Sequence, residues 1–229
     1  MDVGLFMMPL HPPRRSFADS YGRDLTLLVE ADQLGYHEGW IGEHITETWE
    51  NAPVPELLIA QALARTERII LATGVTMLPL HHPVDTAHRI AMLDHMARGR
   101  FYWGIGVGSL PTDLRLYGVD YHSMDDVWER GKEAEEHQYV NRQAQGTLRY
   151  VKRDPAMPDE AVDVDYMMEH VWIVGDPQEC ADKICQLYDE VGGFGHLLAI
   201  TQDPDGHSLM QRSLRLLMEE VAPRVSDLT

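Results

Sequence analysis

Apolar and polar positions change their spacing regularly along this chain, with short apolar runs followed by longer stretches of helical period. The run VGLFMM at residues 3–8 has the length of a buried strand, and in residues 17–34 Leu25 and Leu28 fall at helical spacing before Gly35. The same pattern predicts further strands at 39–42, 68–78 and 100–107 and further helices at 54–64 and 84–97. Strands that alternate with helices in this way are typical of βα units around a parallel sheet.

The second half of the chain keeps this alternation only in part. Residues 124–145 have a helical but strongly polar pattern, and residues 146–165 are the one candidate linker or long loop. Beyond that segment the pattern predicts a strand at 171–174, a helix at 177–191, a strand at 196–201, and a last helix with Met210, Leu214, Leu217 and Val221 on one face.

These elements make about six βα units in a single domain over residues 1–229. A complete (β/α)8 barrel needs eight units of about 30 residues each. The predicted fold class is therefore α/β, a TIM-type (β/α) barrel that is shortened or incomplete.

The composition says little about the fold, but it excludes several classes of binding partner. Thirty-seven acidic residues against 19 basic ones give a formal charge of −18, a field that repels nucleic-acid phosphates and anionic lipids. Cys180 and Cys185 are too few for a disulfide framework, no apolar run approaches the ~18 residues of a membrane span, and the N-terminal run lacks the order of a secretory signal. We therefore expect a cytoplasmic protein that binds neither nucleic acid nor membranes.

Two segments after predicted strands could carry chemistry. GEHITETWE, residues 42–50, places Glu43 and His44 at the carboxyl end of a strand, where ligands bind in parallel α/β folds. These two side chains are equally compatible with a catalytic role and with capping of a loop. Gly74 interrupts the strand at 68–78, which indicates either a bulge beside a ligand or, somewhat more simply, a packing glycine.

Other motifs are weaker. GIGVG at residues 104–108 offers backbone amides near a strand end but lacks the spacing of a dinucleotide fingerprint. The chain has 12 histidines, yet no HxH or HExxH occurs, and the adjacent His81 and His82 precede Pro83, so their side chains are expected to diverge. We expect no metal site from these patterns.

Several ordered motifs at matching spacing resemble one known family. They are GEHITE at 42–47, IILATGVTMLPLHHPV at 69–84, LDHMARGRFYWGIGVG at 93–108 and LYGVD at 116–120. The chain is similar to the luciferase-like flavin monooxygenases, closest to the branch that hydroxylates limonene and alkanes, over residues 1–120 and again from about residue 154. The resemblance implies a TIM barrel, a flavin across its carboxyl-end mouth, and pairing of subunits as dimers.

The resemblance also assigns roles to residues. His44 matches the active-site histidine near the flavin, and Glu43 matches the acid beside it. Gly74 and Val75 fall where the family has a non-prolyl cis peptide in a bulge against which the flavin ring rests. The implied cofactor-binding set is completed by Thr73, Gly106 and Val107.

Relative to the family pattern, one portion is absent or replaced. The stretch between about residues 130 and 154 would carry strands five and six with much of the flavin phosphate site. Val107 also stands where an arginine of the luciferase helps to hold that phosphate. We therefore expect weak discrimination in favour of the phosphate group.

The resulting functional hypothesis is a flavin-dependent monooxygenase that uses O2 and FMN. Because the chain shows no pyridine-nucleotide fingerprint, reduced flavin is expected from a separate flavin reductase. The expected partners are a small apolar substrate, enclosed by Met8, Trp40 and Trp103, and a second copy of the chain in a homodimer. Two alternatives stay open: a non-catalytic flavin-binding protein with a truncated barrel, and a deazaflavin-dependent oxidoreductase.

Overall fold

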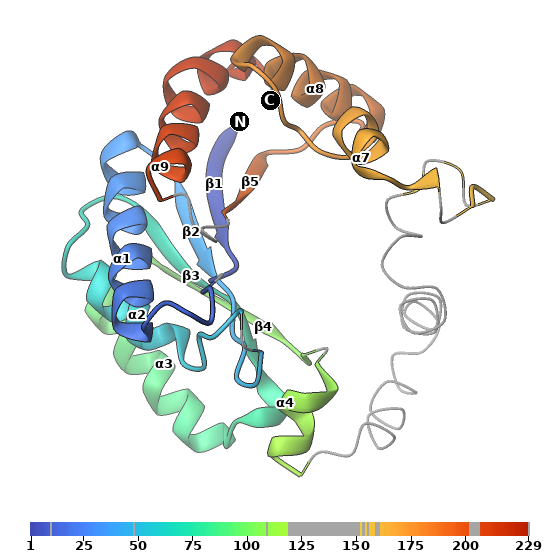
Figure 1. Ribbon diagram of the computed structural model, residues 1–229. Helices are drawn as coiled ribbons and strands as arrows, with labels where there is room; N and C mark the ends of the chain where they lie inside the picture. The colour runs from blue at the N-terminus through green and yellow to red at the C-terminus, as the bar shows by residue number, and fades with distance from the viewer. Residues whose placement is uncertain are drawn as a thin grey trace.

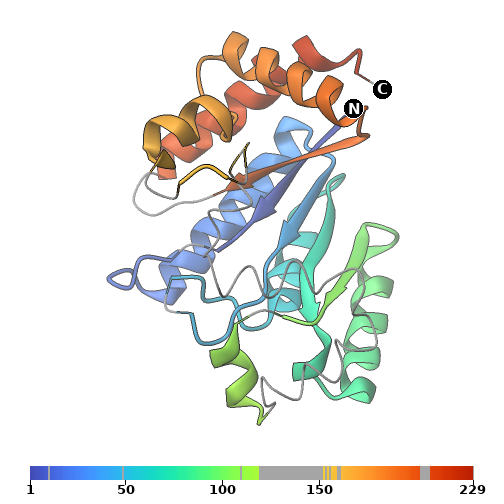
Figure 2. The same cartoon turned by 90° about the vertical axis from the view of Figure 1, so that its right-hand side faces the viewer.

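A computed structural model of the chain describes residues 1–9, 11–47, 49–108, 110–118, 161–201 and 207–228, with residues 152, 154 and 156–158 between them. Within these residues, five parallel strands form one sheet in the order β4-β3-β2-β1-β5. The strands are β1 (Asp2–Met7), β2 (Glu38–Ile41), β3 (Ile70–Met77), β4 (Phe101–Gly106) and β5 (His196–Thr201). Both chain ends lie together near the start of β1 (Figures 1 and 2).

Helices cover one face of this sheet. Figure 1 shows α1 (Phe17–Leu34), α2 (Pro55–Leu63) and α3 (Pro83–Ala97) side by side along that face. Next to α1 lies α9 (His207–Leu216), which continues into a π-helical turn, Leu217–Val221, and a 3-10 turn, Ala222–Val225, both packed against α8 (Pro177–Val191). A 3-10 turn, Leu78–Leu80, follows β3, and two short helices, α4 (Pro111–Leu116) and α7 (Val164–His170), complete the described elements.

Local sequence signals define the ends of the long helices. The Ser16 hydroxyl accepts the backbone N–H of Asp19 at the start of α1, and Gly35 ends that helix with φ 87°, a conformation that favours glycine. Asp176 and Glu179 form a reciprocal capping box at the start of α8. These ends agree with the helix limits predicted at 17–34 and 177–191.

Alternate strand residues build the two faces of the sheet. Leu5, Ile41 and Leu71 are fully buried under the helices, where they join Leu28 and Ile59 in the main core. Successive side chains of a strand point to opposite faces of the sheet, so the neighbours of these buried residues lie on the other face. That second face, called the concave face below, carries Phe6, Trp40, Ala72, Tyr102 and Ile200.

The barrel is not closed among the residues that the structure describes. There β4 and β5 have one neighbouring strand each, and on the concave face the side chains of Tyr102 and Ile200 are 42% and 64% exposed. The predicted fold class, an incomplete TIM-type α/β barrel, is confirmed, but with five described strands instead of six. The helix predicted at 124–145 lies outside the described residues.

The strand predicted at 171–174 is wrong. Residues 172–174 have no regular secondary structure and pair with no described strand. Instead, the Lys183 ammonium donates to the backbone carbonyls of Met168, Trp172 and Val174 at 2.7, 3.1 and 3.2 Å. A β-branched run predicted a strand because the sequence does not show that a lysine of the next helix satisfies these carbonyls.

The irregular segment predicted at 146–165 runs slightly too far. Helix α7 begins at Val164 because the Asp163 side chain accepts the Tyr166 N–H as an N-cap. None of the helices described in the structure has the length and apolarity that crossing a bilayer requires.

Candidate functional site

The Glu43 carboxylate joins the carboxyl ends of β2 and β3. One oxygen accepts the backbone N–H of Met77 at 2.9 Å, and the other lies 2.6 Å from Nε2 of His81. The Glu43 side chain is 1% exposed. Burial disfavours its charged form and raises the pKa of Glu43 above its usual 4.5, although the Met77 N–H and His81 act in the opposite direction.

The interaction continues from His81 into the helical layer. The His81 Nδ1 atom lies 3.5 Å from the Arg89 guanidinium, whose Nε is 3.3 Å from the buried carboxylate of Glu56. These four side chains therefore connect the β2 loop, the β3 loop, α2 and α3. Glu43 is therefore held within this network, and its role as an acid beside a cofactor stays a prediction.

His44 points between two carboxylates. Its Nε2 lies 3.3 Å from Glu50, and its Nδ1 lies 3.6 Å from the buried carboxylate of Asp113 on α4. The backbone of His44 pairs with Ala52 in an isolated antiparallel bridge, which holds the loop after β2 in place. The imidazole is 17% exposed, and its Nδ1 has no hydrogen-bond partner among the described residues. The two carboxylates thus hold a partly exposed imidazole, a group that can both accept and donate a proton, beyond the carboxyl end of β2.

Asp113 is a site residue that sequence reasoning missed. Its carboxylate accepts the backbone N–H of Thr46 at 2.7 Å and the Thr46 hydroxyl, and it is fully buried. It fixes the loop that carries His44. The only signal in the sequence was an aspartate in the first turn after Pro111, which is typical of any helix start.

The predicted bulge and cis peptide in the third strand are both present. The Gly74–Val75 peptide is cis, and the β3–β4 register shifts between Thr73 and Thr76. A Cβ at Gly74 would lie 3.0 Å from the Phe6 ring and 3.3 Å from Cβ of Trp40, so Gly74 is closely packed on the concave face. The packing interpretation of this glycine is therefore correct, and the flavin-contact interpretation stays a prediction.

The remaining residues of the implied cofactor set pack on one another across β3 and β4. The Thr73 hydroxyl donates to the carbonyl of Gly104, and a Cβ at Gly106 would lie 2.6 Å from Cγ2 of Val75. The glycines of GIGVG therefore allow close approach of the two strands. Val107 packs beside Met77, Leu80 and Leu114 in a small apolar cluster.

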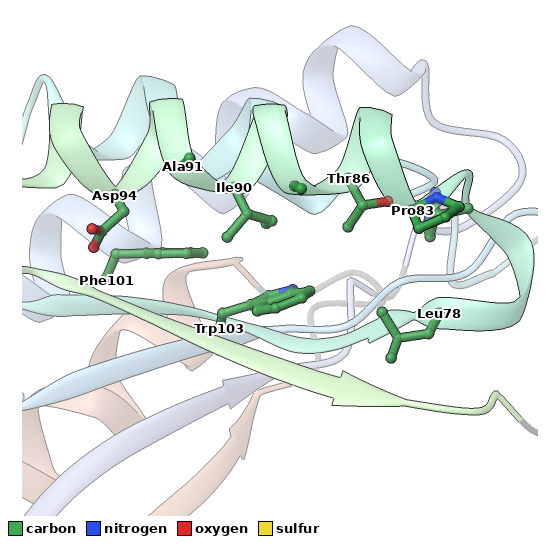
Figure 3. Close-up of a pocket in the computed structure, with 10 residues that line it drawn as sticks. Leu78, Pro83, Thr86, Ile90, Ala91, Asp94, Phe101 and Trp103 are labelled. Carbon is green, nitrogen blue, oxygen red and sulfur yellow. The ribbon is translucent and has the colours of Figure 1, made fainter.

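The three predicted substrate-pocket residues are not brought together. Trp40 is on the concave face, and Met8 lies near the end of β2, because its Sδ would be 3.4 Å from a Cβ at Gly42. Trp103 belongs to the other face, where its indole N–H donates to the Thr76 hydroxyl. There it lines a pocket of about 690 Å³ between β4 and α3 (Figure 3).

Comparison with known proteins identifies the family of the chain. The family model for luciferase-like monooxygenases matches residues 1–136. The chain belongs to this family. Its match covers more than half of the sequence and includes the segments that carry Glu43, His44 and the Gly74–Val75 bulge.

Curated members of the luciferase-like family match different lengths of the chain. The chain is 48% identical over 120 residues to the 4-hydroxyprotoasukamycin monooxygenase of Streptomyces nodosus subsp. asukaensis, which is 52% of this chain and 32% of that protein. It is 30% identical over 221 residues to the 3,6-diketocamphane 1,6-monooxygenase of Pseudomonas putida, which is 96% of this chain and 56% of that protein. The chain thus spans from about a third to little more than half of these relatives.

A solved structure shows the same fold. The oxygenating constituent of 3,6-diketocamphane monooxygenase from Pseudomonas putida, described as a type II Baeyer-Villiger monooxygenase in complex with FMN, has a TM-score of 0.80 and 20% identity. The alignment covers 97% of this chain and 98% of that chain. The five strands described here are therefore part of a luciferase-like TIM barrel.

The concave face of this luciferase-like chain fits the ring part of a flavin. Trp40 has a buried indole Nε1 without a hydrogen-bond partner among the described residues, and Tyr102 lies beside it with a ring distance of 6.3 Å. An unpaired buried donor and aromatic surfaces suit a flat conjugated ring with carbonyl acceptors. The phosphate is different, because Val107 contributes only apolar surface at the end of β4.

Proposed function

We propose that this protein is a flavin-dependent monooxygenase that oxidises a small apolar substrate with O2 and reduced FMN. The observation that carries the proposal is the position of His44, a partly exposed imidazole held between Glu50 and Asp113 beyond the carboxyl end of β2, in a chain of the luciferase-like family. Bound reduced flavin supplies two electrons, so that one oxygen atom enters the substrate and the other leaves as water.

The side chains of the chain have separate tasks in this proposal. His44 holds or moves a proton, because an imidazole can both accept and donate one. Asp113 and Glu43 position the loops that carry the site, through the backbone N–H groups of Thr46 and Met77. Trp40 and Met8 offer apolar surface that excludes water from the substrate. We assign no substrate contact to Trp103, since it faces α3.

A separate reductase is part of the proposal. The glycines of the GIGVG segment allow close packing of β4 on β3, and the segment lacks the spacing of a dinucleotide fingerprint. We therefore propose that reduced flavin is delivered by another protein. A mixture of this protein, FMN and an NADH-dependent flavin reductase is expected to oxidise substrate, whereas omission of the reductase is expected to abolish turnover unless chemically reduced flavin is added.

A homodimer is also proposed. Helices α2 and α3 expose four large apolar side chains to more than 50% each, a surface that a second copy would cover. They are Leu57, Val84, Met92 and Met96. Light scattering at micromolar concentration is expected to give twice the chain mass, and a monomer would contradict the proposal.

His44→Ala tests the catalytic assignment. Loss of a positioned general acid or base lowers rates by about 10² to 10⁴, while truncation of this half-buried ring is expected to cost less than about 1.5 kcal/mol of stability. The matched control is His82→Ala, at an exposed imidazole outside the site. Retention of more than about a tenth of the parental turnover would contradict the role of His44.

Two measurements on the parent protein test the deazaflavin-dependent and the non-catalytic alternatives. Titration with FMN and with a deazaflavin, followed by fluorescence, shows which cofactor binds. If the parent protein binds reduced FMN but oxidises no terpene, ketone, aldehyde or alkane, the non-catalytic flavin-binding function replaces the proposed one.

A further inference from the structure

A cluster of metal-ligating side chains lies at the amino ends of β1, β2 and β5, the opposite end of the sheet from Glu43 and His44. One carboxylate oxygen of Asp2 and one ring nitrogen each of His37 and His196 lie within 4.8 Å of one another. The His37 and His196 rings meet edge to face with a centroid distance of 5.5 Å. We propose that these three residues bind one divalent transition-metal ion of the zinc class.

Backbone pairing holds the three candidate ligands in place. Asp2 and His196 are direct partners in the β1–β5 ladder, so their side chains leave the sheet on the same face. The backbone N–H of His37 donates to the carbonyl of Val3, and its carbonyl accepts the N–H of Ile70. Ligands fixed on paired strands need little reorganisation to bind an ion.

A buried carboxylate beside the cluster supports the metal assignment. The Glu38 side chain is 6% exposed and lies 3.3 Å from Nδ1 of His196 and 3.9 Å from Nδ1 of His37. Gly4 leaves the space that the Glu38 side chain occupies, because a Cβ there would lie 2.6 Å from Cγ of Glu38. Carboxylates that contact the second nitrogen of a ligating imidazole orient the ring and increase its basicity.

The charges of the cluster favour a cation. Glu38 has only the two imidazoles as ion-pair partners in the part of the chain that the structure describes, and Asp2 adds a second carboxylate. The Nδ1 atom of His37, which lies 3.9 Å from Glu38, is buried and makes no hydrogen bond there. Two neutral imidazoles with carboxylates are a ligand set that zinc and its neighbours in the first transition row prefer, and Asp2 and His196 are exposed enough for an ion to enter from solvent.

Binding would connect parts of the chain that are far apart in sequence. Residues 2, 37 and 196 meet only because β5 returns to pair with β1. An ion held by all three residues therefore cross-links β5 to β1 and to the residue before β2, and stabilises the folded chain because the unfolded chain has no such site.

The test uses the full chain, freed of metal with EDTA, and Zn²⁺ alone as the probe. Calorimetric titration at pH 7.5 is expected to show that one equivalent of Zn²⁺ binds per chain. In thermal unfolding, Zn²⁺ is expected to raise Tm, and EDTA is expected to reverse this shift. His196→Ala and His37→Ala are expected to weaken Zn²⁺ binding at least tenfold, and His82→Ala is the matched control that leaves it unchanged. Co²⁺ in place of Zn²⁺ is expected to give a visible ligand-field spectrum that His196→Ala alters.

Asp2→Asn removes one carboxylate at an exposed position without loss of volume, so it provides a second variant if an alanine variant fails to fold. It is also expected to weaken Zn²⁺ binding at least tenfold. Absence of one-to-one binding to the parent, or equal affinity in the parent, His196→Ala and Asp2→Asn proteins, would overturn the proposal. Flavin titration is independent of this result, because the cluster lies at the other end of the strands.

Discussion

The Glu43 carboxylate and the His81 imidazole lie 2.6 Å apart, although each belongs to the loop after a different strand. Glu43 also accepts the N–H of Met77, so one buried side chain fixes the end of β3 relative to the end of β2. The position of the neighbouring His44 depends on this anchor. Glu43, next to the candidate catalytic histidine, thus holds the two loops together. Substitution of Glu43 is therefore expected to destabilise the site.

Glu43→Ala is expected to destabilise the fold by about 1–3 kcal/mol, because it leaves a buried N–H and a histidine without their acceptor. Glu43→Gln keeps an acceptor for Met77 and removes a buried charge, so its cost at neutral pH is expected to be smaller. The pKa of Glu43 is raised in the folded state, so its ionised form opposes folding above that pKa. The stability of the parent relative to Glu43→Gln should therefore increase as pH falls toward 4.5, as measured by urea unfolding at several pH values. A difference that does not vary with pH would contradict this assignment.

Asp32 is the anchor at the other end of the sheet. Its carboxylate accepts three consecutive backbone N–H groups, residues 67–69, at 2.7 to 3.0 Å. Burial alone would raise the pKa of Asp32, but these hydrogen bonds and Arg68 lower it below 3.8. Asp32→Asn is expected to cost about 1.5–3 kcal/mol, since an amide cannot accept all three.

The pH dependence of Asp32 has the opposite sign to that of Glu43. A lowered folded-state pKa contributes stability that is complete above about 3.8 and is lost as pH falls through the lower folded value. The difference between the parent and Asp32→Asn in urea unfolding should thus shrink below pH 4. Asp85→Asn, at a carboxylate that is 78% exposed, serves as the control and is expected to change stability by less than about 0.5 kcal/mol.

Gly104→Ala tests the close approach of β4 to β3. The added Cβ would overlap the carbonyl oxygen of Thr73 and lie 3.0 Å from the Trp40 ring. Because a backbone atom cannot move aside cheaply, a loss of about 1–3 kcal/mol is expected in thermal or urea unfolding. Gly22→Ala is the matched substitution: Gly22 lies in α1 with no atom within 4 Å of a new Cβ, and a gain of about 0.5–1 kcal/mol is expected. Equal effects of the two changes would contradict the packing interpretation.

Riboflavin is expected to bind nearly as tightly as FMN. Val107 lies in an apolar cluster, and the Arg100 guanidinium is engaged by Thr66, Leu63 and Ile69. Neither residue can then provide the charged contact of about 1.5–3 kcal/mol that would separate the two ligands. Fluorescence titrations should give dissociation constants within about tenfold. A preference for FMN above about a hundredfold would show that another cation, with exposed Arg115 as the first candidate, holds the phosphate.

Much of the N-terminal half could be predicted from the sequence because its information is local. Ser16 and Gly35 mark the ends of α1, and the short apolar run at residues 3–8 marks a buried strand. The family motifs also indicated the Gly74–Val75 cis peptide. The strand predicted at 171–174 is wrong because Lys183 of the next helix satisfies its carbonyls, an interaction that the apolar, β-branched pattern does not show.

The candidate sites themselves required the tertiary structure. The sequence alone determined that Glu43 and His44 follow a strand, and therefore that they lie at a ligand-binding edge. It could not show that His81 and Asp113 approach them, or that Asp2, His37 and His196 gather at the opposite end. Side chains separated by tens to nearly two hundred residues meet only when strand order and register bring their backbones together. Local propensity determines each element, whereas these long-range pairings decide which charges become neighbours.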